Sequence, residues 1–261
     1  QTMDRTMAAK TAGLEPEQVE IHTTYLGGGF GRRANPRSDF VTEAVQVAKA
    51  IGKPVKVVWT REDDLRGGFY RPMWADLIEA GIAEGGKPLA WKHTIVGQSI
   101  VADTPFEASM TKDGIDITSV EGAATLPYAI PNLQVELHSP KNAVPVQWWR
   151  SVGHSHTAFV VETMIDELAR IAGKDPVAYR LDILPAASRY RGVLQLAADK
   201  AAWGKMKLLS DHAYGVAVHK SFNSYVAEIA EVSLENGKIR VHRVVAAVDC
   251  GMVINPDGVR Q

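Results

Sequence analysis

The chain has 261 residues, of which 46% are hydrophobic and 23% charged, an ordinary composition for a globular protein of one large or two modest domains. The formal net charge is −1 and no basic run is present, which argues against a nucleic-acid or anionic-membrane partner. The single cysteine, Cys250, excludes an internal disulfide framework and an iron–sulfur cluster held by cysteines of this chain, and we expect it to be buried and inert.

Sequence patterns typical of helices and of strands alternate in the N-terminal quarter of the chain. Residues 4–13 are rich in Ala, Met and Lys and predict a short helix. Residues 19–25 alternate apolar and polar side chains, which predicts a strand. After a glycine-rich run, apolar residues at helical spacing over 40–48 predict a second helix, and the β-branched stretch 54–60 predicts a buried strand. Strand, glycine loop, helix and strand would make a βαβ-like front unit.

The middle of the chain reads as strands and loops. Residues 73–83 and 88–96 predict a hairpin around the turn at 84–87. Residues 97–130 have no clear period and predict long loops, which often carry function. Residues 133–138 predict another strand.

Helices and then strands fill the C-terminal part. Three helices are predicted, at 155–171, from Pro176, and over 190–203. An antiparallel meander is predicted over 214–218, 225–234 and 238–248, with a turn at Glu235-Asn236-Gly237. These patterns predict an α+β fold with mixed sheets, central helices and a C-terminal meander. The helix-rich stretch divides it into a first region, 1–204, and a second, 205–261.

The run Tyr25-Leu26-Gly27-Gly28-Gly29-Phe30-Gly31-Arg32-Arg33 is the most informative feature. Glycine reaches positive φ and allows close approach to the backbone, so that several peptide N–H groups can converge on an anion. Two adjacent guanidiniums favour a phosphate-bearing cofactor. The run lacks the final glycine of the dinucleotide fingerprint G-x-G-x-x-G and the Gly-Lys-Ser/Thr ending of a P-loop. The alternative is a tight turn whose glycines serve geometry only.

Three stretches in the same order carry a family resemblance. They are the glycine run with its flanks from Val19 to Asp39, the stretch Val144-Pro145-Val146-Gln147-Trp148-Trp149-Arg150-Ser151-Val152-Gly153-His154-Ser155-His156, and Asp249-Cys250-Gly251-Met252-Val253-Ile254-Asn255-Pro256-Asp257. Together they resemble the molybdenum hydroxylases, whose large subunits bind molybdopterin. The Gly-Arg-Arg ending and the Trp-Arg-Ser-Val-Gly-His run look most like the isoquinoline 1-oxidoreductase branch. The resemblance implies that the chain is an internal, molybdopterin-binding part of such a subunit.

The resemblance also implies which residues form the site. The cofactor-binding residues would be Gly28, Gly29, Phe30, Gly31, Arg32, Arg33, Arg150, Ser151 and Val152. The substrate pocket would be lined by Phe30, Trp148 and Trp149, although core packing is the other explanation for the two tryptophans. Metal-ligating side chains are not expected, because the family holds its metal through the pterin. The two-residue spacing of His154 and His156 does not match a zinc-ligand pattern either.

Two positions bear on the substrate. Purine-oxidising relatives continue the loop as Gly-Gly-Lys-Glu, with a glutamate that contacts the substrate, whereas Ala34 follows Arg33 here. A site that has lost this carboxylate would bind a purine poorly, so an isoquinoline-like N-heterocycle or an aldehyde fits better than xanthine. Gln147 stands where the family often has a small residue, and nothing in the sequence explains it.

By resemblance, the whole enzyme hydroxylates its substrate with oxygen from water, using molybdenum on molybdopterin, in the cytosine dinucleotide form. A small subunit with [2Fe-2S] clusters would take the electrons, in the cytoplasm or the periplasm of a bacterium. The family's general base is a glutamate in a Gly-Glu-Pro-like motif, which this chain lacks, so no catalytic residue is assigned and the chain alone is expected to be inactive. The alternative function is a structural or subunit-docking module without a cofactor. A nicotinamide dehydrogenase is disfavoured by the glycine spacing.

Overall fold

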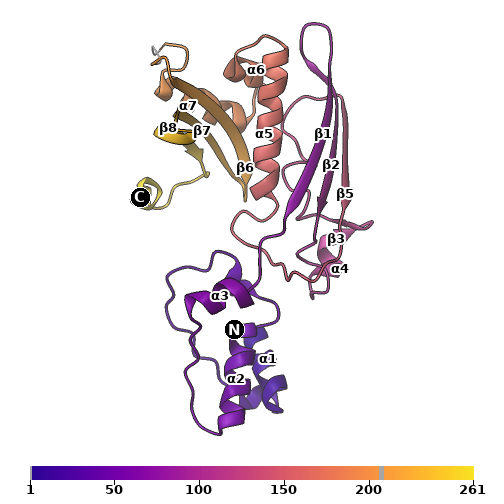
Figure 1. Cartoon of the computed structure of the whole chain (residues 1–261), viewed down its shortest axis with the longest axis vertical. Coiled ribbons are helices and arrows are strands. Elements are labelled where there is room, and N and C mark those ends of the chain that lie inside the picture. The colour runs from indigo at the N-terminus through magenta and orange to yellow at the C-terminus, as the bar shows by residue number, and fades with distance from the viewer. Residues whose placement is uncertain (1, 206–208) are drawn as a thin grey trace. The chain divides into compact units, whose positions relative to one another are not determined.

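The computed structural model describes residues 2–205 and 209–261, which form two compact units (Figure 1). The first unit consists of Gln1–Met73, Gly97–Ser119 and Ser139–Val152, and the second of Trp74–Val96, Val120–His138 and Gly153–Gln261. Each unit is therefore assembled from segments that lie far apart in the sequence. The predicted functional boundary after residue 204 stays a prediction.

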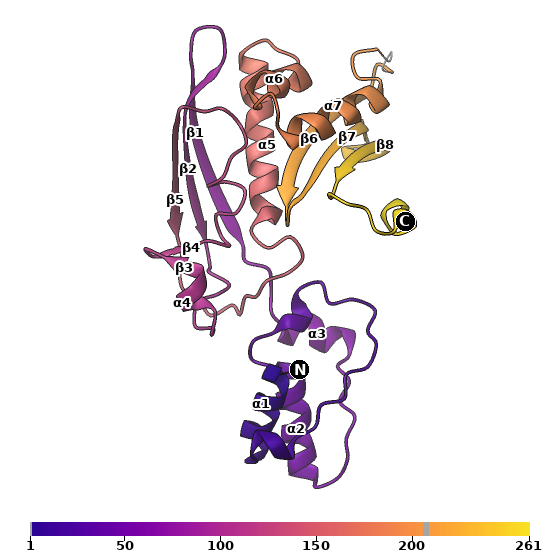
Figure 2. The same ribbon diagram turned by 180° about the vertical axis from the view of Figure 1, so that it is seen from behind.

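The first unit is mainly helical. Its elements are α1 (Thr2–Ala12), the 3-10 turns η1 (Pro16–Gln18) and η2 (Arg32–Ala34), α2 (Asp39–Ile51), α3 (Arg61–Gly67), the short α4 (Glu107–Met110) and the antiparallel pair β3 (Thr111–Lys112) and β4 (Ile115–Asp116). Helices α1 and α2 pack side by side (Figures 1 and 2). Helix α2 ends where Gly52, at a φ of 66°, donates its N–H to the carbonyl of Ala48. Both predicted helices of this region are confirmed.

The two predicted strands on either side of the glycine loop and α2 are wrong. Residues 19–25 and 54–60 belong to no strand, so the βαβ-like front unit does not form among the described residues. Side-chain exposure still alternates along the second stretch, where Val57 is half-buried and Val58 is 73% exposed. Alternation indicates an extended backbone, but a strand also requires a neighbour that completes its hydrogen-bond ladder. The alternation in the sequence therefore indicates an extended backbone, but it does not indicate whether a neighbouring strand is present.

The second unit contains two three-stranded sheets and the long helices. Strands β1 (Trp74–Ile82), β2 (Pro88–Gly97) and β5 (Asn132–His138) form one sheet, in which β2 and β5 run parallel and Ala90 lies opposite Asn132. Strands β6 (His212–Ser221), β7 (Ser224–Glu235) and β8 (Lys238–Asp249) form the antiparallel meander. The helices are α5 (His154–Ile171), α6 (Pro176–Ile183), α7 (Arg189–Ala201) and the short α8 (Pro256–Arg260).

Local sequence explains most of these boundaries. The Asp175 carboxylate accepts the N–H groups of Val177 and Ala178 at the start of α6, as expected for an N-cap residue. The β7–β8 turn places Asn236 at a φ of 52° and Gly237 at 74°, the double positive φ of a type I′ hairpin. The predicted α+β fold, its mixed sheet, its helices and its meander are confirmed. The stretch 97–130 also contains α4, β3 and β4, which its lack of period did not predict.

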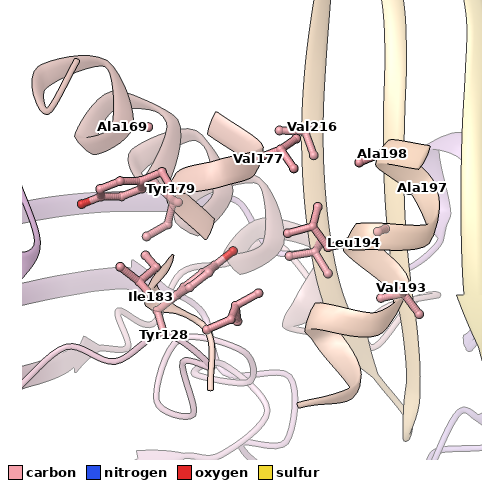
Figure 3. Packing of buried hydrophobic residues seen from close by; sticks show 14 of the residues in the cluster. Tyr128, Ala169, Val177, Tyr179, Ile183, Val193, Leu194, Ala197, Ala198 and Val216 are labelled. Atoms are coloured by element: carbon pink, nitrogen blue, oxygen red, sulfur yellow. The ribbon is translucent and has the colours of Figure 1, made fainter. Parts of the chain in front are cut away.

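Helix α5 runs between the two sheets of the second unit (Figures 1 and 2). Its buried face includes Val161, Ile165 and Leu168, which join one apolar core with residues of α6, α7 and the meander. Leu194 of α7 and Val216 of β6 belong to the same core, as Figure 3 shows. Burial of such side chains contributes about 1.5–3 kcal/mol each, so this core fixes the position of α5.

A buried charged network ties α6 to α5. The Arg180 guanidinium donates through Nε to the carboxylate of Glu162, 3.0 Å away, and through Nη2 to the Glu162 carbonyl. Glu162 also accepts the Tyr128 hydroxyl and the Val218 N–H. Burial alone would lower the pKa of Arg180, but the facing Glu162 carboxylate raises it above its ordinary value. The network keeps a charge inside the core by giving it fixed partners.

The C-terminal segment corrects the expectation for the lone cysteine. Cys250 is exposed, because it lies just past the end of β8, where Gly251 turns the backbone with a φ of 80°. Of the helices that the structure describes, none is long and apolar enough to cross a membrane.

Candidate functional site

The glycine loop of the first unit holds a folded-back aromatic side chain. Gly28 has a φ of 127° and Gly31 of 93°, and Phe30 between them has a positive φ of 51°. A Cβ on Gly28 would lie 2.8 Å from the Phe30 ring. Glycine is therefore required at position 28 both for the backbone conformation and for the ring to fold over it. Phe30 as a whole remains 58% exposed.

The stretch 144–156, here called the tryptophan–arginine stretch, lies more than a hundred residues further along the sequence. Its residues Trp148 to Arg150 pack directly on the glycine loop. A Cβ on Gly31 would lie 2.8 Å from the carbonyl oxygen of Trp148 and 2.9 Å from the Cα of Trp149. One residue further, the Arg150 N–H donates to the Phe30 carbonyl over 2.9 Å. Main chain therefore meets main chain without a side chain between them. The structure brings together two of the three stretches that carried the resemblance.

The backbone after Arg150 is strained. Ser151 has a φ of 77° and Val152, a β-branched residue, of 46°. A positive φ is a genuine outlier for a β-branched residue and costs on the order of 1–3 kcal/mol. The Val152 N–H donates to the Trp149 carbonyl over 2.8 Å, which holds the turn closed. Strain of this kind gathers at binding sites, where neighbouring contacts over-determine the conformation.

The two arginines of the glycine run have different surroundings. The Arg32 side chain is buried, with Nη1 and Nη2 at 3.1 and 2.6 Å from the two oxygens of Asp39. Its guanidinium also lies 4.3 Å over the Phe40 ring. The Arg33 side chain is exposed. Arg32 therefore braces the loop against α2, and Arg33 is the member of the pair that is available to an external anion.

A second exposed guanidinium lies at the same loop. The Arg150 side chain is exposed, with its guanidinium 5.8 Å from the centre of the Phe30 ring. Arg71, which no sequence pattern singled out, donates from Nη2 to the Arg150 carbonyl over 2.9 Å. Arg150 thus brings a positive charge to Phe30, and Arg71 brings a second one to the main chain at Arg150.

The two tryptophans differ in environment. Trp148 is half-buried and meets the Phe106 ring edge-on, with ring centres 5.7 Å apart. Trp149 is also half-buried, and its Nε1 is buried without a hydrogen-bond partner among the described residues. Trp148 lines a pocket of about 380 Å³ within the first unit, together with Phe69, Asn35 and Gln147. The size is that of a small-molecule site.

Two histidine clusters lie in the second unit. His154 Nδ1 and His219 Nε2 are 2.8 Å apart, so one ring donates and the other accepts. Burial and the charge of His154 lower the pKa of His219 to about 4. Elsewhere, Asp76 accepts from His93 Nε2 at 2.8 Å and from His156 Nδ1 at 3.2 Å.

The ionisation of Asp76 follows from this second cluster. Burial alone would raise the pKa of Asp76, but the hydrogen bonds from the two histidines outweigh it and bring the pKa to about 2. His156 in turn stacks on Trp74, with ring centres 4.2 Å apart. Within residues 2–205 and 209–261, no group of three or more His, Cys, Asp or Glu side chains is arranged to hold a metal ion. Both clusters tie α5 to neighbouring strands.

The chain has relatives among proteins of known function. The chain is 31% identical to the beta subunit of isoquinoline 1-oxidoreductase from Brevundimonas diminuta, over 99% of this chain and 33% of that protein. It is 26% identical to a membrane-bound aldehyde dehydrogenase [pyrroloquinoline-quinone] from Gluconacetobacter polyoxogenes, over 97% of this chain and 36% of that protein. The chain thus spans about a third of the length of these curated relatives.

Solved structures share the fold. Quinoline 2-oxidoreductase from Pseudomonas putida 86 superposes with a TM-score of 0.68 at 18% identity, over 92% of this chain and 35% of that one. Residues 1–183, which include both halves of the glycine-loop site, match the sequence model of the molybdopterin cofactor-binding domain. The chain belongs to the molybdopterin cofactor-binding domain family.

Proposed function

We propose that this chain supplies one wall of the molybdopterin site in a molybdenum-dependent oxidoreductase that hydroxylates an N-heterocycle or an aldehyde. The main support is the meeting of the glycine loop with the tryptophan–arginine stretch, through the Gly31 contact and the hydrogen bond from Arg150 to Phe30. The match to the molybdopterin cofactor-binding family model covers residues 1–183, which contain both of these stretches.

The residues of the loop fit a phosphate-bearing pterin. Gly31 leaves no side chain between the loop and the backbone at Trp148, and the Phe30 side chain is exposed on the loop. Exposed guanidiniums of Arg33 and Arg150 suit a phosphate group. The cytosine dinucleotide form, which brings two phosphates, is part of the proposal. When bound, the molybdenum cofactor supplies the two-electron oxidation that accompanies oxygen transfer from water.

The chain's own residues bind and orient. Arg33 and Arg150 would hold phosphate. The glycines of the loop, Gly28, Gly29 and Gly31, would let the cofactor approach the main chain. The strained residues Ser151 and Val152 would keep the turn after Arg150 in place. Phe30 and Trp148 would shape the side on which a planar substrate lies. Arg32 donates both of its guanidinium NH2 groups to the Asp39 carboxylate and so fixes the loop against α2.

The substrate class rests on the loop and on the relatives. Ala34 offers no carboxylate to a purine, and the relative with 31% identity is named for isoquinoline. We propose an N-heterocycle first and an aldehyde second. Electrons would leave through a small iron–sulfur subunit with [2Fe-2S] clusters, and the general base would be a glutamate that this sequence does not contain.

The decisive test is molybdenum content by elemental analysis, with release of the pterin nucleotide, on the whole protein expressed where the cofactor is made. The expected result is about one molybdenum and one cytosine-containing pterin per chain. Pterin release matters because one relative is named for pyrroloquinoline quinone, which would give a quinone and no pterin. A whole protein without metal or pterin would leave a structural or docking module.

Two variants assign the phosphate contacts. Arg33→Ala and Arg150→Ala should each lower pterin occupancy severalfold, because each removes one charge-assisted contact worth about 1.5–3 kcal/mol. Arg61→Ala is the matched control, since Arg61 is an exposed arginine of the same unit that pairs with Asp64 one turn away. Equal occupancy in all three variants would contradict the assigned contacts while leaving the family assignment intact.

A further inference from the structure

Two residues in the wall of the pocket beside Trp148 carry buried polar atoms that have no hydrogen-bond partner in the part of the chain that the structure describes. Gln147 is 2% exposed, and both its Oε1 and its Nε2 are buried without a partner among the described residues. Asn35 is 6% exposed, and its Nδ2 is likewise buried without a partner in that part of the chain. Both residues line the same pocket of about 380 Å³. Buried amide groups left unpaired cost about 1–3 kcal/mol each, so their presence calls for an explanation.

Hydrogen bonds fix the main chain at Gln147 and the side chain of Asn35. The Gln147 N–H donates to the Tyr70 carbonyl over 3.0 Å, and the Tyr70 N–H donates to the Pro145 carbonyl, which pins the segment before Trp148 like a short parallel strand. The Asn35 Oδ1 accepts the Arg37 N–H over 2.9 Å. That bond fixes which amide atom of Asn35 is the oxygen, and therefore leaves the NH2 group as the unpaired donor.

The unpaired atoms are neutral, and the buried charge in the pocket wall is already compensated. Asp116 is 2% exposed and also lines the pocket. It accepts the N–H and hydroxyl of Thr118, the Ser99 hydroxyl and the Ser119 hydroxyl. Four donors satisfy the carboxylate, which leaves little capacity for a ligand cation. Among the described residues that line the pocket, the buried atoms without a partner are thus two amide NH2 groups and one amide oxygen.

We propose that this pocket binds a neutral, planar heterocyclic lactam, recognised through the carboxamide of Gln147. A lactam ring carries an N–H donor and a C=O acceptor on adjacent atoms. The Gln147 Oε1 accepts the ring N–H, and the Gln147 Nε2 donates to the ring carbonyl. Asn35 Nδ2 supplies a further donor in the same pocket, and the flat side chains of Phe69 and Trp148 suit stacking on the ring.

The ligand class also has a chemical meaning. Hydroxylation at the carbon next to a ring nitrogen gives a product whose stable form is a lactam. An unreacted N-heterocycle or an aldehyde offers an acceptor only, and would leave Gln147 Oε1 unpaired. The pocket therefore discriminates in favour of the oxidised molecule. The site itself is inferred from the pocket, and only its link to the reaction product rests on the proposed function.

Calorimetric titration of the whole chain tests the pairing directly, with 1(2H)-isoquinolinone, its N-methyl derivative and isoquinoline as probes. The N-methyl compound has the same ring and carbonyl and lacks only the N–H. We expect the isoquinolinone to bind. The other two compounds should bind with an affinity lower by on the order of tenfold or more, because each leaves the buried Gln147 Oε1 unpaired. Equal affinity for the N–H and N-methyl compounds would overturn the proposal, as would no binding of the isoquinolinone.

Two variants locate the binding. Gln147→Leu should abolish the preference for the N–H compound over the N-methyl compound, whereas Gln195→Leu, at an exposed glutamine of α7, should keep it. Circular dichroism checks that each variant is folded. If the variant at Gln147 keeps the preference, the lactam binds elsewhere and the proposal is wrong. Lactam binding needs no cofactor, so molybdenum and pterin contents measured on the same samples report separately on the proposed function.

Discussion

Replacement of Gly31 by alanine tests the contact on which the site depends. The added Cβ would lie 2.8 Å from the Trp148 carbonyl oxygen and 2.9 Å from the Trp149 Cα. Both are main-chain atoms, so neither can rotate away as a flexible side chain would. The loop and the tryptophan–arginine stretch must therefore move apart, and the hydrogen bond from the Arg150 N–H to the Phe30 carbonyl must lengthen or break.

The expected cost follows from two contributions. Alanine at a φ of 93° is strained, by on the order of 1–3 kcal/mol. Loss of the hydrogen bond between Arg150 and Phe30 adds about 1 kcal/mol. We expect Gly31→Ala to lower the free energy of unfolding of the first unit by about 2–4 kcal/mol. In the whole protein, cofactor occupancy should fall with it.

Gly27→Ala is the matched control in the same loop. A Cβ on Gly27 meets no atom within 4 Å, and its φ is not positive. Urea unfolding followed by tryptophan fluorescence compares the two variants, and hydrogen exchange at the Arg150 amide reports the contact itself. If Gly31→Ala unfolds at the same urea concentration as Gly27→Ala, with unchanged exchange at Arg150, then the close approach does not exist in solution.

Two further predictions concern the second unit. Because the folded pKa of His219 is about 4 and its ordinary value is 6.5, the unfolded state binds more protons between these values. Stability should be full above pH 6.5 and fall by on the order of 1–2 kcal/mol on acidification to pH 4. Urea titrations across that range check it, and His219→Gln should flatten the profile. A wild-type profile that rises towards pH 4 would refute the sign. Arg180→Met leaves the Glu162 carboxylate buried without its cation and should cost about 3–5 kcal/mol. Arg170→Met, which breaks an exposed pair, should cost under about 1 kcal/mol, and equal midpoints would count against the buried network.

The sequence by itself determined the elements whose causes are local. Asn236 and Gly237 specify their hairpin because both can adopt positive φ, and Asp175 begins α6 because its carboxylate reaches N–H groups two and three residues on. The same kind of reasoning failed at residues 54–60, where alternation produced an extended segment without a partner. The glycine run and the tryptophan–arginine stretch were recognisable in sequence as parts of one site.

Only the tertiary structure decided what those motif residues do. The sequence does not distinguish Arg32 from Arg33. In the structure, Arg32 forms a bidentate pair with Asp39 that fixes the loop against α2, whereas Arg33 is exposed. Gln147 has no explanation in the sequence, whereas the fold places this residue, whose amide is unpaired, in the wall of the same pocket as Asn35. Periodicity and propensity describe neighbours along the chain. Which buried polar groups find partners is set by segments about a hundred residues apart, and no local pattern encodes that pairing.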